Sequence, residues 1–493
     1  MGKLFGRIAV LSDREIEMIH HASLEILDTV GMKIYHDEAR TILRDFGCRV
    51  DENERRVTFP PELVDNSVHK LRDDYLRPER VGLKQAVRYT EVSYYRRDDD
   101  LFHDFTCNSG GFVTMVYDLE GKRRPATMDD FYRAMKLVNA LDDITYSGVP
   151  CSDQKTPHYL RPIKMTAELV KYTKKLGGIE SWTKDDVRYC EEIAIVVRGS
   201  RERLLREPCL VGYGEVRSPL ALDENMADIF IEYVRRGFPQ SLDTMPAAGT
   251  TAPAASAGTL ALGLAETLAG LVLGYAIDEN AVLSLDFTGS YSDMKSLLFS
   301  SASPDRMPLL CGRIQMLRDY YGISSGVHGG KTNACEPGFQ AGMEKLQSTL
   351  FPLLCGATGI GTIGQLENLM TFSPVQLVLD AELVRGVRRM LAGFDVSPET
   401  LSLDAIRRIG PEGNFIADPG TAEHFRREFW LSDLTECSGW ETYTGKGIRG
   451  MENLAAEKAR EIMAGPLEPV LDDDQIAEID RIVAHAKKHL ERQ

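Results

Sequence analysis

The feature that most constrains the fold of this chain is a regular alternation of short apolar runs and longer amphipathic stretches from residue 106 onward. Eight runs have the composition of strands, and each is followed by a stretch with helical periodicity. The expected strands are residues 111–117, 144–149, 177–182, 209–213, 240–245, 281–287, 323–328 and 353–363. The expected helices are residues 128–141, 157–175, 185–198, 223–236, 254–275, 304–321, 337–350 and 373–391.

Eight strand–helix units in succession predict an α/β fold, a (β/α)8 TIM barrel with parallel strands inside and helices outside. An open, doubly wound sheet shows the same alternation and is the alternative. Helical signals at both ends predict additions to the barrel. We expect an N-terminal helical extension with a short hairpin over residues 1–105, a barrel with an irregular C-terminal cap over residues 106–465, and a C-terminal helix over residues 466–493.

The charge and composition exclude some classes of partner. The formal net charge is −16, from 74 acids against 58 bases, which disfavours binding to a phosphate backbone. The most apolar stretch, residues 254–277, is interrupted by Glu266 and several glycines, so no membrane span is predicted. Nine cysteines without a CxxC pair are typical of reduced thiols. We therefore expect a cytoplasmic protein without a nucleic-acid or membrane partner.

In a barrel, reacting groups lie where the strands end and the following loops begin. This rule selects Asn108, Ser109, Cys151, Asp153, Trp182, Tyr213, Glu215, Asp243, Met245, Asp286, Phe287, Tyr291, His328, Lys331, Gln365 and Glu367. The set is rich in carboxylates and aromatic rings, and the ten histidines show no H-x-H or H-E-x-x-H spacing. We expect no bound metal. A zinc ion held by Cys151, His328 and Glu367 is the alternative.

Two glycine-rich segments suggest other chemistry. Residues 359–364 match G-x-G-x-x-G, and Asp380 lies near the distance that a dinucleotide fold requires. Seven strand-like units precede the motif, which favours a tightly packed barrel strand and leaves a dinucleotide-dependent oxidoreductase as an alternative. The loop that contains Gly329 and Gly330 fails the P-loop pattern, because Ser325 stands where the first glycine belongs. Its backbone can still approach a ligand closely.

The same loop carries a family resemblance. Residues 329–344 read G-G-K-T-N-A-C-E-P-G-F-Q-A-G-M-E, which resembles the S-D-A-K-x-P-D-x-Q-A-G-x-E turn of the trimethylamine methyltransferase superfamily. Pro337 and the Q-A-G-M-E run match, whereas Asn333, Cys335 and Gly338 depart from the pattern. Further similar segments are residues 11–27, 57–64, 124–130 and 254–275.

The resemblance implies methyl transfer from an amine to the cobalt of a corrinoid that a separate small protein carries. This chain would then bind no cofactor tightly itself. The founding members carry pyrrolysine near the position of residues 334–336, and none is present here. The chain therefore looks like the subgroup without pyrrolysine, which demethylates quaternary amines such as glycine betaine. A corrinoid protein and a small quaternary amine are the implied partners. We also expect a homo-oligomer, in which the amino-terminal helices form the interface.

A quaternary ammonium needs little from the protein beyond binding and orientation, because its methyl group is already electrophilic. Aromatic faces and carboxylates attract such a cation, and a betaine carboxylate needs a cationic or N–H partner. The expected catalytic residues are Glu215, Asp286 and His328. The expected substrate-binding residues are Trp182, Tyr213, Phe287, Tyr291, Arg313, Gly329, Gly330, Lys331, Asn333 and Glu367. A non-catalytic barrel that binds betaine remains a further alternative.

Overall fold

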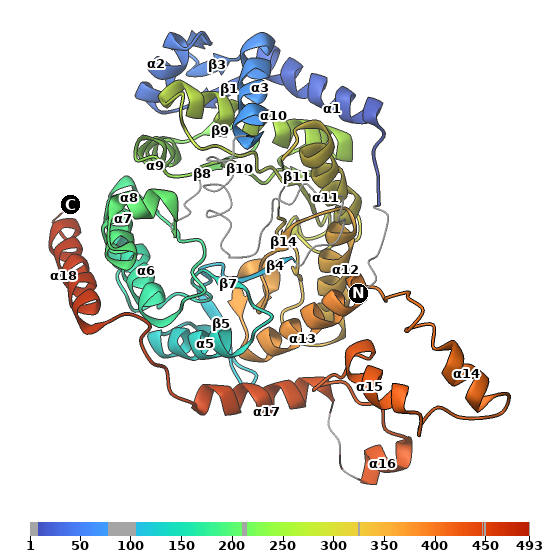
Figure 1. Cartoon of the computed structure of the whole chain (residues 1–493). Coiled ribbons are helices and arrows are strands. Elements are labelled where there is room, and N and C mark those ends of the chain that lie inside the picture. The colour runs from blue at the N-terminus through green and yellow to red at the C-terminus, as the bar shows by residue number, and fades with distance from the viewer. Residues whose placement is uncertain are drawn as a thin grey trace.

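A ring of helices surrounds short parallel strands in the computed structural model, which describes residues 8–76, 105–209, 214–323, 326–445, 447 and 450–492 (Figure 1). The helices of the ring match the predicted units closely. They are α5 (Met128–Ala140), α6 (Arg161–Tyr172), α7 (Lys184–Arg198), α9 (Glu224–Arg235), α10 (Ser256–Ile277), α11 (Arg306–Gln315), α12 (Phe339–Leu354) and α13 (Pro374–Leu391). Capping boxes at Thr127 and Thr183 fix the starts of α5 and α7. The mixed α/β class is therefore confirmed.

The strands inside the ring are short. They include β4 (Thr106–Ser109), β7 (Tyr146–Ser147), β8 (Gly214–Val216), β10 (Leu242–Thr244) and β14 (Gly359–Ile360). β14, β4 and β7 pair in parallel, and so do β10 and β8. Parallel bridges at Leu176, Leu283 and Val327 extend the two groups. Among the described residues these pairings form two arcs and not a closed barrel.

Several strand predictions need correction. Within the part of the chain that the structure describes, residues 177–182 form no strand, and residues 281–287 pair only through the bridge at Leu283. The first inner strand is β4, not residues 111–117, because β5 (Met115–Tyr117) belongs to a side sheet with β6 (Arg123–Pro125), β15 (Gln365–Leu366) and β16 (Thr371–Phe372). The last inner strand begins at Gly359, not at residue 353, because α12 continues to Leu354. The remaining short elements are α8 (Arg201–Arg206), β11 (Ala247–Ala248), β12 (Ser290–Ser292), β13 (Phe299–Ser300), the π-helices Ile26–Val30 and Met316–Tyr320, and the 3-10 helices His158–Leu160 and Glu367–Leu369.

The amino-terminal elements pack against one side of the ring. They are α1 (Asp13–Glu25), β1 (Met32–Ile34), α2 (Asp37–Asp45), the predicted hairpin of β2 (Arg49–Asp51) and β3 (Arg56–Thr58), and α3 (Pro61–Leu76). β1 also pairs with β9 (Ala221–Leu222), and α1, α2 and α3 contact α10. α10 is apolar on all sides, and 89% of its most apolar window is buried inside the protein. A helix of this kind is typical of a protein core.

Glu266 is a buried acid within α10. Its carboxylate accepts hydrogen bonds from the Ser218 hydroxyl and the Leu220 amide, both at 2.7 Å. Burial raises the pKa of Glu266 to about 7, although the two hydrogen bonds act to lower it. The folded state therefore holds this proton more tightly than the unfolded chain, where the pKa of a glutamate is about 4.3. Stability consequently falls as the pH rises from about 4.3 to about 7 and stays lower above that range.

Glu266→Gln should remove this pH dependence, because the glutamine oxygen can accept from the Leu220 amide and its NH2 group can donate to the Ser218 hydroxyl without a buried charge. We expect the variant and the parent to unfold at nearly the same urea concentration at about pH 4. At about pH 8 the variant should be more stable, by on the order of 1–3 kcal/mol. A variant less stable than the parent at the higher pH would show that the ionised carboxylate is the form that α10 requires.

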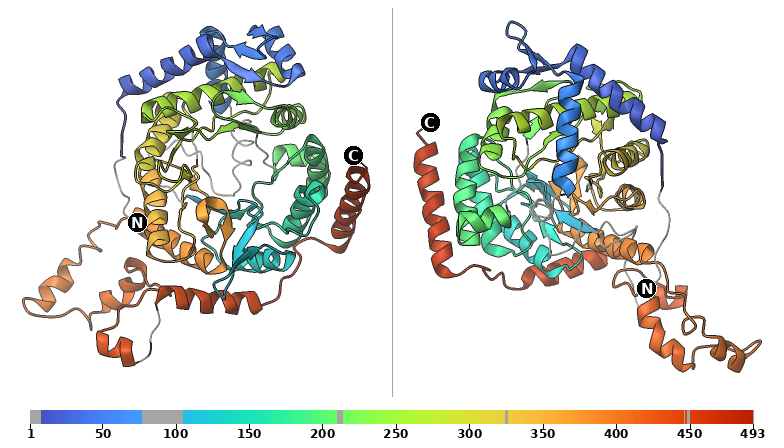
Figure 2. Two further views of the ribbon diagram at one scale, coloured as in Figure 1. Left: turned by 180° about the vertical axis from the view of Figure 1, so that it is seen from behind. Right: turned by 45° about the horizontal axis from the view of Figure 1, so that its top comes forward.

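The carboxyl-terminal helices pack on the outside of the ring. α17 (Met451–Ala464) contacts α5 and α13, and α18 (Asp473–Leu490) contacts α6 and α7. Between α13 and α17, residues 394–445 carry α14 (Leu403–Ile409), α15 (Pro419–Glu428) and α16 (Trp440–Gly445). This segment, which we call the arm, projects away from the ring in every view (Figures 1 and 2).

Candidate functional site

A cavity of about 400 Å³ lies at the carboxyl ends of the parallel strands. Its walls come from residues in or just after the inner strands of both arcs. They are Asn108, Gly110, Gly111, Gly148, Gly178, Ile179, Glu180, Glu215, Val216, Asp243, Thr244, Met245, Asp286, Thr288, His328, Lys331, Thr362 and Leu369. Four predicted site residues, Glu215, Asp286, His328 and Lys331, are thus brought together in one cavity.

Glu215, Asp243 and Asp286 supply three of the four carboxylates that line this cavity. Asp243, the middle residue of β10, and Asp286 each place one carboxylate oxygen, and His328 one ring nitrogen, so that these three atoms lie within 4.8 Å of one another. Burial and the nearby charge of Asp286 raise the pKa of Asp243 well above its usual value. Burial also raises the pKa of Glu215, against the opposing charge of Lys331. A cation that enters the cavity would lower the pKa values of these acids, because a positive neighbour favours their ionised form. The ionised acids then attract the cation.

The pKa values of two basic groups in the cavity are lowered. Burial, reinforced by the charge of Lys331, lowers the pKa of His328 to about 4, so this ring is neutral at neutral pH. Burial and the nearby guanidinium of Arg306 lower the pKa of Lys331 to about 7. Lys331 is almost completely buried, yet it lines the cavity. Near neutral pH its ammonium can therefore form in response to an anionic ligand group.

Two buried arginines hold the loops that carry these residues. Arg313 donates to the Asp286 carboxylate and, at 2.9 Å, to the Gly326 carbonyl, which links the β10-side arc to the loop before His328. Arg306 donates to the carbonyls of Gly289 and Ser301 at 3.1 and 3.0 Å. Arg313 was predicted to bind substrate. The structure instead places it behind Asp286, where it orients that carboxylate.

The predicted aromatic cage is not found among the described residues that line the cavity. Phe287 is fully buried, with the Arg313 guanidinium 5.9 Å from its ring centroid. Trp182 is covered by Phe112 and His158, whose ring centroids lie 5.4 and 4.4 Å away. Tyr291 lies elsewhere and hydrogen-bonds with the Ser256 hydroxyl. Tyr213 falls outside the described residues.

The predicted loop glycines pack against protein rather than facing the cavity. A Cβ on Gly329 would lie 2.5 Å from the Ser348 carbonyl oxygen, so only glycine fits there. The Gly330 carbonyl accepts a hydrogen bond from the Lys345 ammonium at 2.7 Å. The segment from Gly329 to Lys331 is thus fixed by its own contacts, and it contributes the Lys331 side chain to the cavity.

Asn333, Glu367 and Tyr291 line a second, wider hollow of about 930 Å³. Asn333 donates to the Ser300 hydroxyl at 3.0 Å, and Glu367 accepts from Arg123 at 2.6 Å. The two hollows adjoin along residues 367–370, since Leu369 lines the first and its neighbours line the second. Exposed Met294, Leu298 and Met370 give the wider hollow an apolar rim.

The alternatives from the sequence find little support in the geometry. Gly359–Ile360 is a strand followed by a turn into β15 rather than by a helix. Asp380 is buried, where it accepts hydrogen bonds from Lys345 and from the Gly364 amide, so it cannot face a ribose. The zinc set is not assembled, because Glu367 lines the other hollow. Asp243, Asp286 and His328 have a spacing that a metal ion could use, but Arg313 already occupies an oxygen of Asp286.

Glu180 is a cavity residue that the sequence reasoning missed, because the strand was expected to end at Trp182. The Trp182 indole N–H donates to the Glu180 carboxylate at 3.3 Å, so the ring positions this acid. Thr244, Thr288 and Thr362 were also missed. Thr244 and Thr288 each follow a predicted site position directly, and Thr362 lies inside the glycine motif of residues 359–364. In these places only the strand register decides which side chain faces inward.

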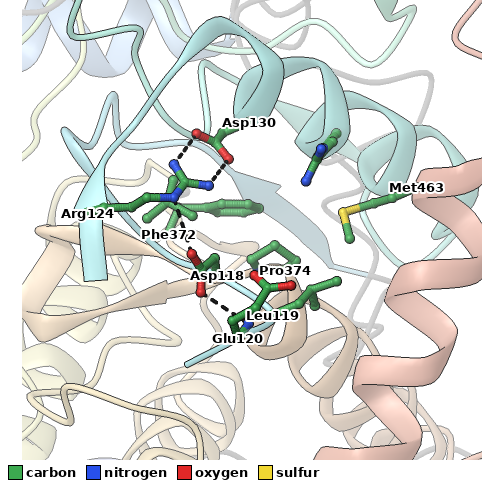
Figure 3. A pocket seen from close by; sticks show the side chains of 10 residues that line it. Asp118, Leu119, Glu120, Arg124, Asp130, Phe372, Pro374 and Met463 are labelled. Carbon is green, nitrogen blue, oxygen red and sulfur yellow. Dashed lines mark hydrogen bonds and ion pairs between the residues drawn. The ribbon is translucent and has the colours of Figure 1, made fainter. Parts of the chain in front are cut away.

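A third pocket, of only about 30 Å³, lies between α5, the side sheet and α17 (Figure 3). Arg124 donates to both oxygens of Asp130, at 2.7 and 2.8 Å, and also to Asp118 at 3.2 Å. Asp130 is the acid of the capping box at the start of α5. The charges of Arg124, Asp118 and Asp130 satisfy one another, which indicates a structural joint and not a ligand site.

Comparison with known proteins now gives the family. The model of the trimethylamine methyltransferase (MTTB) family matches residues 2–491. The chain belongs to this family. It is 25% identical over 494 residues to a glycine betaine methyltransferase of Desulfitobacterium hafniense (strain Y51), covering 99% of each chain. It is 28% identical to the trimethylamine methyltransferase MttB2 of Methanosarcina mazei, over 98% of this chain and 96% of that one.

The sequence-based prediction of a methyltransferase of this family is therefore confirmed. Among solved structures, the monomethylamine methyltransferase MtmB of Methanosarcina barkeri aligns over 99% of this chain and 95% of its own, with 11% identity and a TM-score of 0.38. The likeness to MtmB is too weak to carry any argument about this family member.

Proposed function

We propose that this chain transfers a methyl group from a betaine-like quaternary amine to the Co(I) corrinoid of a separate protein. The observation that carries the proposal is the convergence of Glu215, Asp243 and Asp286 on one small cavity at the strand ends. Several carboxylates around one cavity attract a permanent cation, because their attractions add at the same place. The resemblance to a glycine betaine methyltransferase supports the same class of substrate.

Methyl transfer makes few chemical demands on the protein. When it is bound, the corrinoid would supply Co(I), which provides both electrons of the new Co–C bond. The electron pair of the broken C–N bond stays on the nitrogen. No proton moves, so neutral His328 and the acids need only hold and orient the substrate. The product is an uncharged tertiary amine. It loses its attraction to Glu215 and Asp286, which favours its release.

The tail of a betaine has a natural partner in the same cavity. Lys331 is the buried cation that lines it, and a substrate carboxylate would stabilise its ammonium form. The cavity would then hold the two charges of a zwitterion at two places, with the onium group beside the acids and the carboxylate beside Lys331. Choline lacks the carboxylate and would make only the first contact.

A volume of about 400 Å³ fits a small amine and is too small for a corrinoid, which supports a cofactor carried by a partner. We expect the partner to approach through the wider hollow that adjoins the cavity. We also propose that the two strand arcs belong to one (β/α)8 barrel of residues 106–465, with the amino-terminal extension and the last helix as additions. This arrangement places the cavity at the catalytic face of the barrel.

A methyl-transfer assay with free cob(I)alamin tests the function. Glycine betaine, proline betaine, carnitine, choline and trimethylamine are offered separately, and conversion of Co(I) to methyl-Co(III) is followed by absorbance. We expect turnover with at least one quaternary amine and none with trimethylamine. If no quaternary amine methylates cobalt under fully reducing conditions, the proposal fails. Thermal stabilisation by a betaine without turnover would instead identify a binding protein.

The cavity pKa values predict different pH profiles for betaine and choline. As the pH rises, Glu215 and Asp243 ionise late because their pKa values are raised, and Lys331 loses its proton near pH 7. Both changes favour a simple cation, so choline affinity should rise steadily with pH. Betaine affinity should pass through a maximum, because its carboxylate needs protonated Lys331.

Calorimetric titration across the neutral range measures the two profiles. Lys331→Met is the matched variant, since it keeps the aliphatic stem and removes the charge. This variant should lose the maximum for betaine and keep the rise for choline. Parallel profiles for the two ligands in the parent protein would show that Lys331 does not hold the betaine carboxylate.

A further inference from the structure

The arm, residues 394–445, is an ordered segment with almost no core of its own. Among its described residues only Leu434 is buried. Its large apolar side chains are exposed instead, with Ile416 at 88% and Trp440 at 72%. The full set is Phe394, Val396, Leu401, Leu403, Ile406, Phe415, Ile416, Phe429, Trp430, Leu431 and Trp440.

An arrangement of this kind is unfavourable for one copy in isolation. Fixing the backbone and side chains of a segment costs conformational entropy, and burial of apolar surface is the main effect that offsets this cost. The arm buries little within its own chain, and it projects away from the ring (Figure 2). Its exposed side chains also exceed the scattered apolar residues of an ordinary surface. A surface outside this copy must therefore cover it.

The outer face of α12 offers a matching surface. Phe339, Met343 and Leu346 are exposed, with Phe339 at 87%. They are spaced four and three residues apart, so they form one stripe along the helix. α12 contacts α13, and α13 ends at Leu391, just before the arm begins. The stripe and the arm thus belong to neighbouring parts of the same side of the molecule.

We propose that the arm is a dimerisation element, which packs on the exposed stripe of α12 in a second copy of this chain. A two-fold axis makes the contact reciprocal, because each copy supplies one arm and one stripe. The interface is independent of the proposed methyl transfer. It differs from the amino-terminal helices, which the sequence suggested as interface material.

The area available fits a permanent dimer. Aromatic side chains present about 150–250 Å² each, and at roughly 150 Å² for every side chain of the arm and the stripe their observed exposures offer about 1,200 Å² per copy. Reciprocal burial gives about 2,400 Å² in total, which lies in the range of permanent homodimers. The arm has ten acids against four arginines, so an anionic membrane would repel it. A protein surface with an apolar stripe is the partner that suits it.

Analytical ultracentrifugation of the full chain tests the dimer. The parent should sediment at twice 55.0 kDa at micromolar concentration. Ile416→Glu in the arm and Met343→Glu in the stripe should each give a monomer of 55.0 kDa with an unchanged circular dichroism spectrum. Because each copy carries a formal net charge of −16, added salt should screen the repulsion between copies and tighten the parent dimer. A monomeric parent, or a dimer that survives either substitution, would overturn the proposal.

Met18→Glu on α1 is the matched control, since Met18 is also an exposed methionine on a helix. It should leave the dimer intact. Dissociation by Met18→Glu would move the interface to the amino-terminal helices and overturn the assignment. Tryptophan fluorescence gives an independent readout, because Trp440 belongs to the arm. In a Trp182→Phe/Trp430→Phe background, Ile416→Glu should shift the emission of Trp440 to the red, and an unchanged spectrum would contradict its burial.

Discussion

Glu215→Gln is expected to lower kcat/KM for a quaternary amine about 30- to 150-fold, mainly through a higher KM. Glu215 faces the cavity, and the structure shows no hydrogen bond to its carboxylate from the described residues, so its charge is available to the ligand. Opposite unit charges about 4 Å apart attract by about 1 kcal/mol in water and about 4 kcal/mol near a protein surface, and an intermediate value of about 2–3 kcal/mol corresponds to about 30- to 150-fold in affinity. The substitution keeps the shape of the side chain.

Steady-state kinetics with free cob(I)alamin measure this effect. Glu202→Gln at the start of α8 is the control, because that acid lies outside the cavity. It should behave like the parent. If Glu215→Gln keeps kcat/KM within about threefold of the parent, the Glu215 carboxylate contributes less than about 1 kcal/mol to binding. Glu215 then does not contact the cation. A large loss in kcat at constant KM would instead show that Glu215 stabilises the transition state and not the bound substrate.

Lys345→Met is expected to lower the free energy of unfolding by about 3–5 kcal/mol, the usual cost of leaving one member of a buried ion pair alone. The Lys345 ammonium lies 2.8 Å from the Asp380 carboxylate, and both side chains are at most 3% exposed. Asp380 also accepts hydrogen bonds from the Gly364 amide and the Gln376 side chain. Loss of Lys345 would leave this acid charged and only partly satisfied in the core.

Urea denaturation gives the midpoint for this variant and for two comparisons. Lys345→Met/Asp380→Asn should recover part of the loss, because the buried charge is removed together with its partner. Arg407→Met, which breaks the exposed pair with Asp404, should cost about 0–1 kcal/mol. A loss below about 1 kcal/mol for Lys345→Met would show that water reaches Asp380. Lys345 also donates to the carbonyl of Gly330, the residue before Lys331. Its loss should therefore loosen the position of Lys331 and raise the KM for betaine.

The helices were predictable because their signals are local. α7 runs from Lys184 to Arg198, against an expected 185–198, since a capping box and a 3.6-residue period both lie within the segment itself. The inner strands were harder. β7 and β14 have two residues each, and their pairing partners lie far along the chain. The apolar run at residues 111–117 looked like an inner strand but was taken into the side sheet by β16.

Part of the site followed from the order of elements. Glu215, Asp286, His328 and Lys331 were found because the loops after parallel strands meet at one end of an α/β fold. The aromatic cage could not follow in the same way. Asp286 and Phe287 are adjacent, and neighbouring side chains of an extended segment point in opposite directions. Once Asp286 faces the cavity, Phe287 must enter the core on the other side, where it is fully buried.

The sequence by itself determined the alternation of strands and helices, the family and the acids at the strand ends, because these depend on local periodicity and on the order of elements. Only the tertiary structure decided which side chains face the cavity and that Arg313 stands behind Asp286. It alone also showed that the arm buries almost nothing of its own. Side-chain direction, burial and charge pairing arise from contacts between residues far apart in the chain, and no local pattern encodes them.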